Sequence, residues 1–182
     1  MTSWSSLFGK TTLDGYLDPT AAAGTPYLHL RALIARLIAD GWTEWVDKPS
    51  GAISAIADTA SVWQGAALRE VVLGPEAVVG HGSEVISTIV MDRAKINHLN
   101  AVGRSLVGPG VSITSHVVIA SHRLDREPVK LPPGSFDGVR VLRKFGALIG
   151  HHAVIGAHAV VNPGTVILPE AIVPPLVVYP QG

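Results

Sequence analysis

Residues 149–173 read IGHHAVIGAHAVVNPGTVILPEAIV, and an isoleucine or a valine returns at every sixth position of this segment. The same rhythm runs through the earlier chain, with a step of five residues from 85 to 90 and from 102 to 107. The full series is Leu73, Val79, Val85, Val90, Ile96, Val102, Val107, Ile113, Ile119, Ile149, Ile155, Val161, Ile167 and Val173. A period of six fits neither a helix nor an alternating strand, but it is typical of a parallel β-helix built from hexapeptides. We therefore predict an all-β solenoid with this series facing inward.

The first fifty residues have a different pattern. Apolar side chains at positions 30, 33, 34, 37 and 38 have the spacing of one face of a helix, and Gly41 fits the end of that helix. Trp4, Trp42 and Trp45 also lie in this segment. We expect residues 1–50 to form a helical cap over an open end of the solenoid or against a neighbouring subunit. The β-helix domain is then expected over residues 51–182.

The repeat stops between about residues 121 and 146, where charged residues, prolines and glycines replace the regular apolar positions. Such a segment is too polar to form the interior of a coil. We predict a loop that leaves the solenoid, and long loops in compact proteins usually serve a binding or catalytic site.

Composition excludes several classes of function. The 182 residues carry no net formal charge and no cysteine, so they offer no basic footprint for nucleic acid or a membrane surface, no disulfide and no thiolate chemistry. There is no signal-peptide pattern and no apolar run of about 20 residues, the length that spans a bilayer. We expect a cytoplasmic protein. Hydrophobic residues make up 47% and charged residues 15%, which suggests that further surface is buried between subunits.

Four segments carry a resemblance to a known family. They are NHLNAVG at 97–103, SHRLDREPVK at 121–130, RKFGALIG at 143–150 and NPGT at 162–165. In order and spacing they resemble the acetyltransferase domain of bifunctional sugar-1-phosphate nucleotidylyltransferases, over roughly residues 70 to 170. Those proteins transfer an acetyl group from acetyl-coenzyme A to the amino group of an amino-sugar phosphate.

The resemblance implies a homotrimer of left-handed β-helices, with active sites between neighbouring solenoids, acetyl-coenzyme A or another acyl-coenzyme A as co-substrate, and no metal. His98 matches the family's general base. That role is chemically sound, because an ammonium group cannot attack a thioester and an imidazole can accept its proton near neutral pH. The residues expected to hold the small-molecule acceptor are Asn97, Asn100, Ser121, Arg123 and Lys130. Arg143 and Lys144 are expected to meet the anionic groups of coenzyme A.

This chain departs from the family pattern at several of these positions. Ala101 stands where the family has tyrosine, Arg104 replaces an acidic residue, Ser121 replaces asparagine and Glu127 replaces a lysine. A carboxylate repels a phosphate, so we expect an acceptor other than a phosphosugar. After Lys144 the chain contains no lysine or arginine that could meet the phosphates of coenzyme A.

Other functions remain open at this point. Residues 120–125, ASHRLD, are similar to the Thr-x-His-Pro-Leu-Asp segment of galactoside and maltose acetyltransferases, which makes His122 a second candidate base. γ-Carbonic anhydrases share the expected fold and bind zinc with three histidines; here His81, His116 and His122 could form such a set, although their spacing differs from that family's. A non-catalytic trimeric scaffold, or an enzyme that uses His98 in a non-acyl reaction, are the remaining alternatives.

Overall fold

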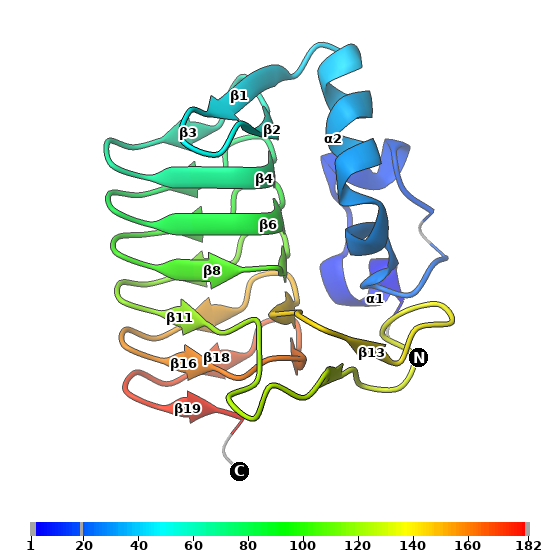
Figure 1. Ribbon diagram of the computed structural model, residues 1–182, viewed down its shortest axis with the longest axis vertical. Helices are drawn as coiled ribbons and strands as arrows, with labels where there is room; N and C mark the ends of the chain where they lie inside the picture. Colours follow the sequence, from blue (N-terminus) through cyan, green and yellow to red (C-terminus); the bar gives the residue numbers. More distant parts are fainter. Residues whose placement is uncertain (1–2, 19, 181–182) are drawn as a thin grey trace.

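The computed structural model describes residues 3–18 and 20–180, which fold into a parallel β-helix with helices along one side (Figure 1). Every member of the six-residue series is buried, none more than 2% exposed. These side chains fill the inside of the solenoid in one continuous apolar cluster. The predicted parallel β-helix and its inward-facing residues are therefore confirmed.

The coils have three faces. The first face is a six-stranded parallel sheet, and the other two share an eleven-stranded sheet. They share it because β4 (Ala67–Leu73) and β6 (Glu84–Val90) bend at Glu70 and Ser87, which have left-handed φ angles of 55° and 46°. The first face consists of β3 (Ser61–Val62), β5 (Val78–Val79), β7 (Lys95–Ile96), β10 (Ser112–Ile113), β15 (Val154–Ile155) and β18 (Ile172–Val173).

The second face begins with the first halves of β4 (Ala67–Leu73) and β6 (Glu84–Val90) and continues with β8 (Ala101–Gly103), β11 (Val118–Ile119), β16 (Val160–Val161) and β19 (Val178–Tyr179). The third face contains the second halves of β4 and β6 together with β2 (Ala52–Ile56), β9 (Leu106–Val107), β14 (Ala147–Ile149) and β17 (Thr165–Ile167). We call the turns between the first and second faces the first corner, and those between the second and third faces the second corner.

The N-terminal segment lies along the third face instead of over an end of the solenoid (Figure 1). It contains α1 (Trp4–Phe8), two 3₁₀ helices, η1 (Thr12–Gly15) and η2 (Thr25–His29), and α2 (Leu30–Ala39). The apolar stripe of α2 is buried as its spacing predicts, against outward-facing side chains of the third face such as Val72, Ile89 and Leu106. At the N-terminal end of the sheet, β1 (Thr43–Asp47) pairs antiparallel with β2 and forms the edge.

A buried carboxylate joins the N-terminal segment to the solenoid. The two carboxylate oxygens of Asp92, which is 7% exposed, accept hydrogen bonds from Thr11 Oγ1 at 3.1 Å, Thr12 N at 2.7 Å and Thr12 Oγ1 at 2.8 Å. Bonds to an ionised acceptor are stronger than neutral ones. This contact holds the start of η1 against a turn of the β-helix.

The interruption of the repeat is an ordered loop between β11 and β14. It contains one short antiparallel hairpin, β12 (Val129–Lys130) with β13 (Val141–Leu142). The loop folds back onto the N-terminal segment, where Asp137 accepts hydrogen bonds from Ala22 N and Thr25 Oγ1. Among the described helices, none has the length and apolar character needed to cross a membrane.

Candidate active site

Histidines gather at the first corner, where turns of successive coils lie next to one another. The third residue of each turn has a left-handed backbone, and these residues are Gly65, Gly82, Leu99, His116, His158 and Leu176. Before the loop, equivalent positions are 17 residues apart, as for Ser83 and Asn100, and after it they are 18 apart, as for Val154 and Ile172. This stacking places His98 at the same position as His81, one coil later. Trp63, in the coil before that of His81, lies against both rings.

Trp63, His81 and His98 form a three-ring cluster on this corner. The ring centroids of His81 and His98 are 5.7 Å apart and their planes differ by 21°, while Trp63 lies 5.0 Å from His81 and 5.5 Å from His98. Within the described part of the chain, neither ring nitrogen of His98 has a hydrogen-bond partner. The half-buried ring of His98 therefore has a nitrogen available to accept a proton from a bound molecule.

Asn97 and Asn100 brace the turn that carries His98. Asn97 Nδ2 donates to the Ile113 carbonyl at 2.9 Å, and the Asn97 carbonyl accepts a hydrogen bond from Ser83 Oγ at 2.7 Å. Asn100 is 2% exposed, and its Oδ1 accepts a hydrogen bond from Val117 N at 2.7 Å. Its buried Nδ2 has no partner among the residues that the structure describes. The contact of both residues with an acceptor stays a prediction.

The loop holds a second group of predicted site residues. A cavity of 430 Å³ is lined by His122, Arg123, Arg126, Glu127, Pro128, Arg143 and Lys144. The structure thus brings the second candidate base together with Arg123, Arg143 and Lys144. Ser121 and the exposed Lys130 are not among the lining residues. In the described part of the chain, the cationic groups of Arg126, Arg143 and Lys144 have no carboxylate within salt-bridge range.

The two candidate bases lie at opposite edges of the second face. His98 is in the turn that leads into β8 at the first corner, whereas His122 follows β11 at the second corner. A single chain therefore presents the three-ring cluster and the loop cavity on different edges. For the two bases to face one cleft, they would have to come from neighbouring copies of the chain.

Arg123 is already engaged within the loop. Its guanidinium donates two hydrogen bonds to the Asp125 carboxylate, and Asp125 Oδ1 also accepts one from Glu127 N at 3.1 Å. The hydrogen bond from Arg123 lowers the pKa of Asp125 to about 2. A ligand anion would have to share this guanidinium with Asp125.

This pair gives a prediction on pH. Because the folded-state pKa of Asp125 lies below that of an unfolded aspartate, about 3.9, the pair stabilises the loop above pH 4 and is lost as the pH falls through about 2. An NMR titration of the Asp125 carboxyl carbon should show a midpoint near 2. In Arg123→Ala the midpoint should rise toward about 4. An unchanged midpoint in that variant would show that Arg123 is not the cause.

His29 ends η2, and the four remaining histidines lie elsewhere on the corners. His116 and His158 stack at 4.7 Å on the first corner, in the two turns that follow the turn of His98. His151 and His152 lie in the turn after β14. Among the described residues no group of three or more histidine, cysteine or acidic side chains is placed to hold a metal ion, so His81, His116 and His122 do not meet within one chain.

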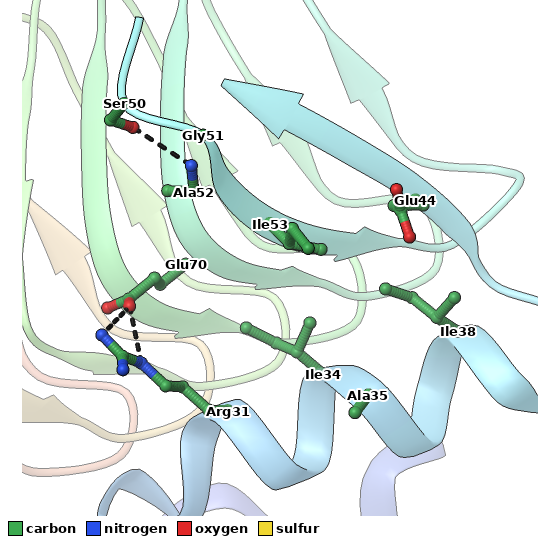
Figure 2. A pocket seen from close by; sticks show the side chains of 10 residues that line it. All are labelled: Arg31, Ile34, Ala35, Ile38, Glu44, Ser50, Gly51, Ala52, Ile53 and Glu70. Atoms are coloured by element: carbon green, nitrogen blue, oxygen red, sulfur yellow. Dashed lines mark hydrogen bonds and ion pairs between the residues drawn. The ribbon is translucent and has the colours of Figure 1, made fainter. Parts of the chain in front are cut away.

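A further cavity, of 630 Å³, lies between α2 and the β1–β2 hairpin (Figure 2). Ile34 and Ile38 of α2 face Ile53 of β2 there, and the ion pair between Arg31 and Glu70 lies at one end. No histidine lines this cavity. The sequence pattern did not predict this cavity, and it did not predict that Trp63 and His81 neighbour His98. The 17-residue coil repeat was the signal that would have found His81.

The family match and the similar curated proteins agree with each other. The family described as GlmU-like, C-terminal hexapeptide, matches residues 42–133, a range that includes His98 and the start of the loop. Bifunctional protein GlmU of Methanococcus vannielii is 40% identical over 81 residues, which are 43% of this chain and 19% of that protein. A bifunctional sugar-1-phosphate nucleotidylyltransferase/acetyltransferase of Sulfurisphaera tokodaii is 35% identical over 77 residues, 41% of this chain and 18% of that protein. The match thus spans about a fifth of the length of these relatives.

Solved structures with related coils are more distant. The acetyltransferase domain of PglB from Neisseria gonorrhoeae, in complex with acetyl coenzyme A, aligns at 18% identity and a TM-score of 0.40, over 83% of this chain and 61% of that one. A mutant of GDP-perosamine N-acetyl transferase from Caulobacter crescentus, in complex with CoA and GDP-perosamine, aligns at 20% identity and a TM-score of 0.38. That alignment covers 85% of this chain and 65% of the other.

Proposed function

Because the chain belongs to the GlmU-like, C-terminal hexapeptide family, we propose that it transfers an acyl group from an acyl-coenzyme A to a small polar acceptor, with His98 as general base. The observation that carries this proposal is the imidazole of His98, which has both ring nitrogens without a hydrogen-bond partner in the described chain and lies in the segment that the family matches. The relatives named as acetyltransferases support the choice of acyl transfer over other uses of the fold.

The reaction needs few groups from the protein. His98 takes a proton from the amine or hydroxyl of the acceptor, whose nitrogen or oxygen then bonds to the thioester carbon. As the tetrahedral carbon collapses, the carbon–sulfur bond breaks and the proton held by His98 passes to the departing sulfur, giving free coenzyme A. Proton transfer of this kind contributes ~10² to 10⁴-fold in rate. The remainder must come from positioning of the two substrates.

The loop cavity fits the anionic part of coenzyme A. Arg126, Arg143 and Lys144 line it and have no carboxylate partner in the described chain, so their positive charges can meet phosphates. Glu127 adds one carboxylate to the same cavity, which these three cationic side chains outnumber. In this proposal Asn97, Asn100, Ser121, Arg123 and Lys130 bind or orient the acceptor. His122 is the alternative base.

The proposal includes a homotrimer. The third face is covered by the chain's own N-terminal segment, which leaves the first and second faces to meet a neighbour. Exposed apolar side chains lie on and beside the second face, among them Leu99, Val118 and Val178. In such an assembly the three-ring cluster of one subunit can face the loop cavity of the next. The cytoplasmic location expected from composition belongs to the same proposal.

The test is acceptor-dependent release of thiol from acetyl-coenzyme A. The purified chain should release thiol with some members of a panel of amines, amino sugars and alcohols. Coenzyme A at 100 times its Kd should also stabilise the fold by about 2.7 kcal/mol, visible as a thermal shift. No release together with no thermal shift would favour a scaffold or a non-acyl enzyme. Stoichiometric zinc in the purified protein would favour a hydratase.

A further inference from the structure

The hydrogen bond of His81 determines where its proton resides. His81 Nδ1 lies 3.0 Å from the main-chain carbonyl oxygen of Gln64, one coil earlier. A carbonyl oxygen only accepts hydrogen bonds, so Nδ1 must be the donor and carry the proton. In the neutral ring Nε2 is then free of a proton. The same bond fixes the orientation of the exposed His81 ring on the corner.

His98 has no comparable bond, and its ring is held by packing. The His81 ring lies nearly parallel to the His98 ring. Trp63, in the coil before that of His81, packs near both rings. The backbone brings these turns close together: a Cβ atom on Gly80 would lie 3.1 Å from His98 Nδ1 and 2.6 Å from the Asn97 carbonyl oxygen. The rings of His81 and Trp63 therefore flank the His98 ring.

We propose that His81 is a positioning residue whose ring, packed against the His98 imidazole, keeps that imidazole in one orientation for proton transfer. The inference rests on the proposed function, in which His98 is the base. A base nitrogen must come within about 2.6–3.2 Å of the proton that it removes. A displacement of about 1 Å can cost as much as 100-fold in rate, so a ring that limits the motion of His98 affects catalysis directly.

The first arm of the test needs no activity. In protein labelled with ¹⁵N-histidine, NMR at neutral pH should show the His81 proton on Nδ1. The Hδ2 and Hε1 protons of His98 should carry ring-current shifts from the rings of His81 and Trp63. His81→Ala should bring these His98 shifts closer to free-histidine values, and His81→Phe, which keeps an aromatic ring, should retain them. Unchanged His98 shifts in His81→Ala would overturn the inference.

The second arm uses the kinetics of the full chain. His81→Ala should lower kcat about tenfold with KM for the acyl-coenzyme A within about twofold, because orientation of the base affects the chemical step. His81→Phe should recover most of kcat. His158→Ala removes another exposed ring of the same corner and should leave kcat unchanged. If His81→Phe is as slow as His81→Ala, a nitrogen of His81 takes part in the chemistry and the positioning role is wrong.

The two arms separate this inference from the proposed function. Full activity of a His98→Ala variant would refute His98 as the base, while the NMR arm would still report whether His81 orients His98. Since His81 is exposed, its variants should keep the wild-type thermal unfolding temperature, which serves as the check on folding.

Discussion

Replacement of His98 by alanine should lower kcat for acyl transfer by ~10² to 10⁴-fold, the usual contribution of a general base, and leave KM for the acyl-coenzyme A nearly unchanged. The side chain is expected to act on the acceptor's proton and not on the anionic groups of coenzyme A, which are assigned to the loop cavity. The measurement is initial-rate thiol release at saturating acceptor.

Two further variants make this prediction specific. His158→Ala removes an exposed histidine from the same corner and should keep wild-type rates. His122→Ala removes the second candidate base and should cost less than His98→Ala. Full activity in His98→Ala with loss of activity in His122→Ala would move the base to the loop, and the family resemblance to galactoside and maltose acetyltransferases would then be the better guide.

Gly146→Ala should destabilise the fold by about 2 to 3 kcal/mol, the upper part of the range for overpacking in a tight interior. Gly146 is where the loop rejoins the solenoid: its N donates to the Arg104 carbonyl at 2.9 Å and its carbonyl accepts from Gly164 N at 2.7 Å. A Cβ atom at this position would overlap the Gly103 carbonyl oxygen and Ser105 Oγ. Both are held in place, since Ser105 Oγ donates to that carbonyl at 2.8 Å.

The matched control is Gly15→Ala, since a Cβ atom on Gly15 would meet nothing within 4 Å. Urea unfolding followed by circular dichroism measures both variants. We expect the control to stay within about 0.5 kcal/mol of the wild type, as surface substitutions usually do. A similarly small change for Gly146→Ala would show that the junction of loop and solenoid can widen. In that case the loop residues Arg143 and Lys144 would be less firmly placed than the contacts indicate.

Part of the site could be predicted from the sequence because it is local. His98 stands in a recognisable segment, and the polar run that interrupts the repeat marks the loop with His122, Arg143 and Lys144. The surroundings of His98 are not local. Trp63 and His81 reach it only through the stacking of coils, and Asn100, expected to bind the acceptor, is buried inside the corner with a hydrogen bond to Val117.

The sequence by itself determined the coil interior, since each inward residue follows from a six-residue period that the geometry of one coil imposes. It also determined the apolar stripe of α2, which depends only on helical spacing. Only the tertiary structure decided where α2 lies. Val72, Ile89 and Leu106 face outward from the third face and need a covering layer, but the sequence does not say whether a helix of the same chain or another subunit covers them. That choice depends on contacts between residues far apart along the chain, because burial of apolar surface is not directional.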